Sequence, residues 1–233
     1  MTHDPSLVRR LNRLVWEAAR FVLPAVGLGL GFVWFFAADS LADDLGRASA
    51  TSHVAIAAAT LIAGAISLLT LLALKWSLLG RVRPGKHPLW SCWCSRWDFL
   101  YVAWGFLARP ALAVFDGCLL QSVLLRLFGM RIGPGVLLGG AFAQVVDPDM
   151  LHFGAGATVA GLFQAHTFED RVLKIAPLEI GPGATLGAGA LAFYGVRLEA
   201  GSRALPHGVA LKGETLAAGR DYAGVPLVPR TWD

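Results

Sequence analysis

A repeat of six residues runs through the second half of the chain. Aliphatic or small side chains hold this spacing without a break at Ile180, Leu186, Ala192, Leu198, Ala204 and Ala210. A six-residue period is typical of a parallel β-helix, in which each unit forms a short strand and a corner, and three units close one coil. We therefore predict an all-β, left-handed parallel β-helix of the hexapeptide type over residues 131–225, followed by a C-terminal tail at 226–233.

The six-residue period breaks twice before the regular stretch begins. Its phase places the starts of successive coils at Ile132, Phe153, Ile180 and Leu198. Within the second coil, Val159 and Ala165 continue the period, and the first two coils are longer than the third. Both insertions fall on the third side of their coils, so two loops, residues 147–149 and 166–171, should stack along one edge. Functional groups often lie on such loops.

The first half of the chain is apolar enough to need a membrane. Charged residues make up 15% of the whole chain, against about a quarter in soluble domains. Residues 21–38 and 54–74 contain no charged side chain, and about 20 apolar residues span a bilayer as a helix. We therefore predict a membrane α-helical N-terminal part with two transmembrane helices within 21–79, and membrane lipid as a partner.

Basic residues flank the two apolar segments on one side of the membrane. They are Arg9, Arg10, Arg13 and Arg20 before the first segment, and Lys75, Arg81, Arg83 and Lys86 after the second. The loop between the segments has only one basic residue, Arg47. Because positive residues stay on the cytoplasmic side, we expect the N-terminus and the β-helix to be cytoplasmic, at a bacterial inner membrane. His87 joins the second group in a juxtamembrane cationic cluster.

Two further segments of the first half have weaker patterns. Residues 1–20 place apolar side chains on one helical face and arginines on the other, which predicts an amphipathic interfacial helix. Residues 80–130 are rich in tryptophan, which favours the headgroup level of a membrane. We expect interfacial or re-entrant helices there, with a third full span as the alternative.

A family resemblance attaches to the longer insertion. Residues 165–174, Ala-His-Thr-Phe-Glu-Asp-Arg-Val-Leu-Lys, followed by Ile-Gly-Pro-Gly-Ala at 180–184, resemble the hexapeptide-repeat acyltransferase-like C-terminal modules of poly-lysine-synthetase-type nonribosomal peptide synthetases. Residues 83–91, 212–216 and 224–226 look like other motifs of that family. The resemblance implies a membrane-linked module that joins an activated acyl or aminoacyl group to an amine or hydroxyl. Those synthetases carry such modules in tandem, which implies that three copies of a single module associate.

Acyl transfer from a thioester needs a base that deprotonates the acceptor, and histidine suits this task near neutral pH. His166 opens the longer insertion and is the candidate base. Glu169 or Asp170 would orient its imidazole, and Arg171 would hold a carboxylate or phosphate. His152, near the shorter insertion, is a candidate for substrate binding or a histidine at a coil corner. The alternative for the longer insertion is structural, with an acidic residue bound to Arg171 and His166 packed.

Other polar residues have simpler interpretations. Asp147 and Asp149 flank a proline, which is typical of a turn, although paired carboxylates also share acid–base work. His207 lies in a turn sequence, and Lys212 with Glu214 is either a surface pair or a cofactor contact. The histidine spacing does not predict a metal site, and the three cysteines read as free thiols. No run of basic residues predicts nucleic acid as a partner.

The sequence therefore predicts a membrane-anchored acyl- or aminoacyl-transferase. Its donor would be the thioester of CoA or of a carrier protein's phosphopantetheine, with no tightly bound cofactor. The expected assembly is a homotrimer, with a carrier protein or synthetase as a partner. Two alternatives stay open: an acyl-CoA-dependent O- or N-acyltransferase of a cell-envelope acceptor, and a non-catalytic trimeric scaffold that docks a partner at the membrane.

Overall fold

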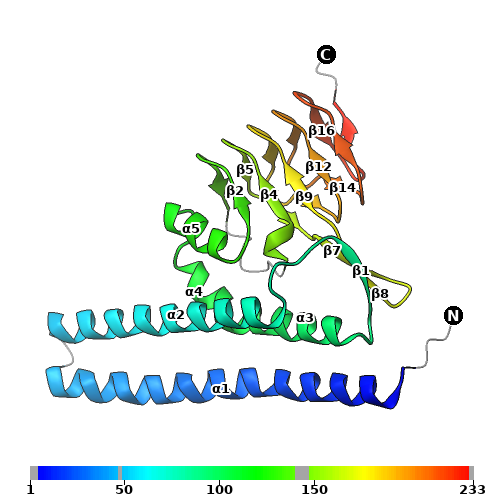
Figure 1. Cartoon of the computed structure of the whole chain (residues 1–233). Helices are drawn as coiled ribbons and strands as arrows, with labels where there is room; N and C mark the ends of the chain where they lie inside the picture. Colours follow the sequence, from blue (N-terminus) through cyan, green and yellow to red (C-terminus); the bar gives the residue numbers. More distant parts are fainter. Residues whose placement is uncertain (1–4, 47–48, 140–146, 231–233) are drawn as a thin grey trace.

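The computed structural model describes residues 5–46, 49–139 and 147–230. Helices form the base of the molecule, and a β-helix rises from them toward the C-terminus (Figure 1). Two long helices run antiparallel along the base, and shorter helices lie between them and the first coil. The chain therefore places its apolar helices at one end and its repeats at the other.

The helices differ widely in length. They are α1 (Leu7–Leu45), α2 (Ala50–Leu78), α3 (Cys92–Ala103), the π-helical turn η1 (Trp104–Ala108), α4 (Arg109–Ala113) and α5 (Leu119–Leu127). The segment from α3 to α4 is continuous, and it packs on α1 and α2. Pro110, which has no N–H to donate, follows the π-helical turn, where the α-helical ladder is already interrupted.

The predicted interfacial helix and the predicted first span form one helix. Neither glycine nor proline occurs from Leu7 to Leu23, so α1 runs through residue 20 and continues past Pro24. Contacts with α3 hold its first half, since Arg13 lies 3.2 Å from Asp98. The boundary predicted at residue 20 is therefore a change from amphipathic to apolar character within one helix, and the place of each part at a membrane stays a prediction.

Among the described residues, α2 is the one helix long and apolar enough to cross a membrane. Only 11% of its most apolar window is buried inside the molecule, so most of this surface is open to another apolar phase. The predicted first span at 21–38 forms the middle of α1, and its place in a membrane stays a prediction.

Three sheets form the sides of the β-helix. The first contains β2 (Arg131–Ile132), β4 (Leu151–Phe153), β9 (Leu178–Ile180), β12 (Arg197–Leu198) and β15 (Thr215–Leu216). The second contains β3 (Leu137–Leu138), β5 (Thr158–Val159), β10 (Thr185–Leu186), β13 (Arg203–Ala204) and β16 (Asp221–Ala223). The third contains β6 (Leu162–Phe163), β11 (Leu191–Ala192) and β14 (Val209–Ala210). All of these strands pair in parallel with strands of the neighbouring coils, as a parallel β-helix requires. Its left-handed sense stays a prediction.

The register of the first sheet confirms the predicted starts of the coils. Five inward side chains are in register along it: Ile132, Phe153, Ile180, Leu198 and Leu216. All five are buried. The period of six therefore sets which side chains fill the core, and the two insertions leave that stacking intact.

The prediction for the third side of the second coil was wrong. Phe163, not Ala165, pairs in register with Ala192 of the next coil. The corner after Val159 is two residues shorter than the period requires, and the Phe163 ring meets that of Phe153 at 6.1 Å between centroids. A large side chain thus fills the core at the shortened corner, and Ala165 is buried where the insertion begins.

Two strands lie outside the predicted limits of the β-helix. β17 (Val228–Pro229) pairs antiparallel with β16, so the predicted tail at 226–233 begins as a part of the last coil. β1 (Gly85–Pro88) lies in the predicted helical linker, yet it pairs with β8 (Val172–Ile175). β8 in turn forms a hairpin with β7 (His166–Glu169), so the longer insertion contributes an edge strand to a three-stranded antiparallel sheet whose central strand is β8.

Replacing Ile180 by alanine should lower the free energy of unfolding by about 2–5 kcal/mol. Its side chain is 1% exposed and lies between those of Phe153 and Leu198, so truncation leaves a cavity that neighbouring coils cannot close. Denaturant unfolding of the full chain in detergent measures the effect. Leu137→Ala is the control, since Leu137 is 67% exposed and should change stability little. Equal stability of the two variants would contradict this packing.

Candidate active site

The two insertions meet at one edge of the β-helix, as predicted. Asp147 lies in the insertion of the first coil, and His166 begins the hairpin β7–β8 of the second. The His166 Nδ1 atom lies 2.7 Å from Asp147 Oδ2. The Asp147 side chain is 2% exposed and that of His166 is 12% exposed. A histidine and a buried carboxylate therefore form a short hydrogen-bonded pair at this edge.

Helix α3 supplies the third member of this cluster. The indole Nε1–H of Trp97 donates to Asp147 Oδ1 over 2.6 Å, and the Trp97 side chain is buried. The Trp97 ring also meets the His166 ring edge to face, with 4.8 Å between centroids. Tyr101, one helical turn further along α3, lies 6.3 Å from the His166 ring, and Phe168 lies 6.2 Å from it. The imidazole thus stands among three aromatic rings.

This arrangement fixes which nitrogen of His166 can accept a proton. A carboxylate only accepts hydrogen bonds, so the imidazole nitrogen that faces Asp147 carries its proton. Within the described part of the chain, Nε2 has no hydrogen-bond partner. The indole donor holds the other carboxylate oxygen, so Asp147 cannot rotate away. His166 is therefore presented with its basic nitrogen free, as a general base requires.

Glu169 does not orient His166, contrary to the prediction. Successive side chains of a strand point to opposite faces, and Glu169 is three residues after His166 on β7. It forms ion pairs with Lys174, at 2.5 Å, and with Lys212 of a later coil. Hydrogen bonds from these two lysines hold the pKa of Glu169 at about 2. Glu169 therefore connects the hairpin to a later coil of the β-helix.

Asp170 and Arg171 form the turn of the hairpin rather than a part of the cluster. Both have positive φ, at 51° and 61°, as both central residues of a type I′ turn require. The Arg171 carbonyl accepts from the Leu89 N–H over 3.0 Å, which ties the turn to the segment after β1. The predicted roles of Asp170 in orienting His166 and of Arg171 in holding an anion have no support in this geometry.

Replacing Glu169 by glutamine should loosen the hairpin but leave turnover within about tenfold of wild type, because neither lysine pair touches His166. In wild type, the low pKa of Glu169 stabilises the fold above pH 4.5, and this contribution is lost as pH falls toward about 2. The variant should lack that dependence. Hydrogen exchange of residues 166–175 across this pH range measures it. A loss of turnover as large as that of a His166 variant would restore the catalytic role of Glu169.

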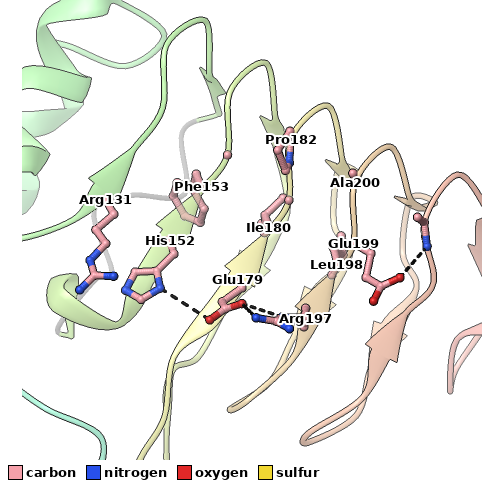
Figure 2. A pocket seen from close by; sticks show the side chains of 13 residues that line it. Arg131, His152, Phe153, Glu179, Ile180, Pro182, Arg197, Leu198, Glu199 and Ala200 are labelled. Carbon is pink, nitrogen blue, oxygen red and sulfur yellow. Dashed lines mark hydrogen bonds and ion pairs between the residues drawn. The ribbon is translucent and has the colours of Figure 1, made fainter.

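His152 contacts different residues from those that His166 contacts. Its Nε2 atom lies 3.2 Å from the Asp149 carbonyl oxygen. Its Nδ1 atom lies 3.9 Å from Glu179 Oε1 (Figure 2). Burial, and after it the charge of Arg131, lowers the pKa of His152. It faces a groove along the first sheet, next to the edge that carries the His166 pair. A role of His152 in substrate binding therefore stays a prediction.

The remaining predicted residues have structural contacts. His207 has a positive φ of 61° in a turn, as predicted. Lys212 pairs with Glu169, and Glu214 accepts from the Leu211 N–H over 2.8 Å, so each member of the predicted surface pair has another partner. Among the described residues, no three histidine, cysteine or acidic side chains gather as a metal site would need. The cysteines Cys92, Cys94 and Cys118 are free thiols.

Asp149 connects the active-site loop to α2. Its Oδ2 atom lies 2.8 Å from Lys75 Nζ and accepts from the Val82 N–H over 3.0 Å. The two charged side chains are buried, at 6% exposure for Lys75 and 2% for Asp149. A side chain at Gly129, which has a φ of 111°, would overlap Asp149. The loop is thus fixed two residues from Asp147 by a buried ion pair.

Sequence reasoning assigned Asp147 mainly to a turn and did not single out Trp97. The signal for Asp147 was present, because the stacking of the two insertions already predicted that residues 147–149 and 166–171 lie together. Asp147 directly precedes the short 3₁₀ turn Pro148–Met150, and its side chain is buried against Trp97 and His166. Trp97 had no local signal, since its role depends on how α3 packs under the hairpin.

Comparisons with known proteins agree with the family resemblance. A delta-poly-L-ornithine synthetase from Acinetobacter baumannii is 28% identical to this chain over 232 residues. The match covers 98% of this chain but only 17% of the length of that synthetase. The predicted resemblance to peptide synthetases of the poly-lysine-synthetase type is thereby confirmed. No family model matches the chain.

Solved structures with hexapeptide repeats are more distant. An acetyltransferase from Vibrio cholerae has a TM-score of 0.41 and 12% identity, over 53% of this chain and 88% of that protein. A serine O-acetyltransferase from Brucella melitensis has a TM-score of 0.35 and 16% identity, over 97% of this chain and 98% of that protein. The strand pairing described above, rather than these similarities, establishes the β-helix.

Proposed function

We propose that this chain is a membrane-anchored acyl- or aminoacyl-transferase with His166 as its general base. The hydrogen bond of 2.7 Å between His166 and the buried Asp147 is the observation that supports this most directly. It orients a histidine, leaves Nε2 free and lies on insertions that the repeats do not need. Burying the charge of Asp147 costs free energy, and its bonds to Trp97 and His166 hold the imidazole in one orientation.

The proposed reaction needs one proton acceptor. As the lone pair of the acceptor's amine or hydroxyl attacks the thioester carbonyl carbon, His166 Nε2 takes the acceptor's proton. The tetrahedral intermediate then collapses, the C–S bond breaks, and the leaving thiolate takes the proton from Nε2. Asp147 stabilises the imidazolium that forms in between, because its carboxylate is already hydrogen-bonded to Nδ1. The products are an amide or ester and a free thiol.

The proposed donor is a thioester of CoA or of a carrier protein's phosphopantetheine. The similarity to a poly-L-ornithine synthetase favours an aminoacyl group, because that protein's name describes a chain of amino acids. The proposed assembly is a homotrimer in the bacterial inner membrane, with the β-helix on the cytoplasmic side. The apolar surface of α2 and the cations at residues 75–86 support this placement.

A donor screen on the detergent-purified full chain tests the proposed function. Acetyl-CoA, longer acyl-CoAs and an aminoacyl-loaded carrier protein are each offered with amine and hydroxyl acceptors, and the released thiol is measured. Turnover with the aminoacyl carrier would support the synthetase-like role. Turnover with acyl-CoA only would favour an acyltransferase of an envelope acceptor. Silence with every donor from an intact oligomer would overturn the proposal in favour of a docking scaffold.

A further inference from the structure

A pocket lined by arginines opens where the helical base meets the β-helix. Its volume is about 340 Å³. Arg81 and Arg83 enter it from the segment after α2, and Arg131 enters from the first strand of the first sheet. Asp149 and His152 lie in its wall. Residues far apart in the sequence thus bring three arginines to the lining of one cavity.

The positive charge of this pocket is not balanced by the described residues. Its one carboxylate, Asp149, is already paired with Lys75 and with the Val82 N–H. The three arginines form no ion pair within the part of the chain that the structure describes. The pKa of His152 is lowered first by burial and then by the positive charge of Arg131. The pocket therefore has the character of a site for an anion.

The pocket continues into a groove along the first sheet. The groove has a volume of about 650 Å³, and Arg131 and His152 line both cavities. Figure 2 shows the outward side chains of successive strands in a row, from Arg131 through His152 and Glu179 to Arg197. Farther up the groove, Arg197 is paired with Glu179 at 2.6 Å. The unpaired positive charge is thus confined to the end next to the helical base.

This end of the groove adjoins the proposed active site. Asp149, in the pocket wall, is two residues from Asp147. Pro177, also in the wall, is two residues from Ile175, which pairs with His166 across the hairpin. Two residues of chain span at most about 7 Å. The pocket therefore lies beside the proposed active site.

We propose that Arg81, Arg83 and Arg131 form a binding site for a phosphate group. The planar guanidinium matches a phosphate with paired N–H donors, and three of them suit a group with two negative charges. Two sources carry this chemistry. One is the phosphate of a pantetheine-type donor, an assignment that rests on the proposed function. The other is a lipid headgroup, since Arg81 follows the end of α2 by three residues.

Equilibrium binding to the full chain in neutral detergent tests this site without turnover. The probes are pyrophosphate, CoA and a short-chain phosphatidylglycerol, at one fixed ionic strength. We expect at least one probe to bind, and Arg131→Gln and Arg83→Gln each to weaken it about tenfold or more. CoA binding with no lipid binding identifies the donor as the source, and the reverse result identifies the headgroup.

The control variant is Arg220→Gln, which removes the same charge from an exposed position outside both cavities and should bind as wild type does. His166→Asn should also bind as wild type does, although its turnover should be about 10²–10⁴-fold slower. Failure of the wild-type chain to turn over any donor, with phosphate binding intact, would refute the proposed function and not this site. The site is refuted if no probe binds, or if the variants at Arg131 and Arg83 bind as tightly as Arg220→Gln.

Discussion

Replacing His166 by asparagine should lower turnover about 10²–10⁴-fold, the usual contribution of a general base, while the fold stays intact. The asparagine amide can still donate to Asp147 from near the position of Nδ1, so the buried carboxylate keeps a partner. No atom of asparagine can take the acceptor's proton. Initial rates of thiol release, with the donor found in the screen, measure the loss, and denaturant unfolding checks the fold. Wild-type rates from this variant would exclude His166 as the base.

Asp147→Asn tests whether the pair acts as one unit. An asparagine has a single acceptor oxygen, and the Trp97 indole can only donate to it. The amide nitrogen must then face His166, where it needs Nδ1 as an acceptor and so moves the proton to Nε2. We expect a loss of about 10²-fold or more, and a double variant little worse than His166→Asn by itself. Additive losses would show that Asp147 acts on something other than the imidazole.

Periodicity predicted most of the β-helix because the inward positions are determined by geometry. A side chain that faces the axis must be apolar and must be repeated in every coil, so Ile180, Leu186 and Leu198 can be read from spacing. The pattern failed at Ala165, where two corners of different length fit the same sequence. Only the size of the Phe163 ring, next to Phe153, selects the shorter corner. Spacing carries no information on that packing.

Coil spacing predicted where the candidate site lies, but not which residues contact His166. The placement of His166 and residues 147–149 on one edge follows from counting coils, and the structure has both there. The choice of partner among Asp147, Glu169 and Asp170 depends on the alternation of β7 and on its turn, which begins at Asp170. Trp97 comes from a helix some 70 residues earlier in the chain, and no local pattern connects it with the site.

Among substitutions in the helical base, replacement of Lys75 should change the stability of the fold most. Replacing Lys75 by methionine should destabilise the fold by roughly 3–5 kcal/mol, the usual result of leaving one charge of a buried pair without its partner. Asp149 would remain buried with the Val82 N–H as its described donor. Denaturant unfolding of the full chain measures the change. Lys86→Met is the matched control, since Lys86 is exposed on β1 and has no ion pair within the described residues.

Neutralising both members of the pair separates charge from packing. In Lys75→Met with Asp149→Asn, the asparagine oxygen still accepts from the Val82 N–H, and no charge is left buried. The double variant should therefore be more stable than Lys75→Met. Because Asp149 is two residues from Asp147, the single variant should also lower turnover at temperatures where it remains folded, and the double variant should recover part of that loss. If Lys75→Met were as stable as Lys86→Met, the pair would not hold the active-site loop to α2. The position of Asp147 against His166 would then depend on the hairpin and Trp97 instead.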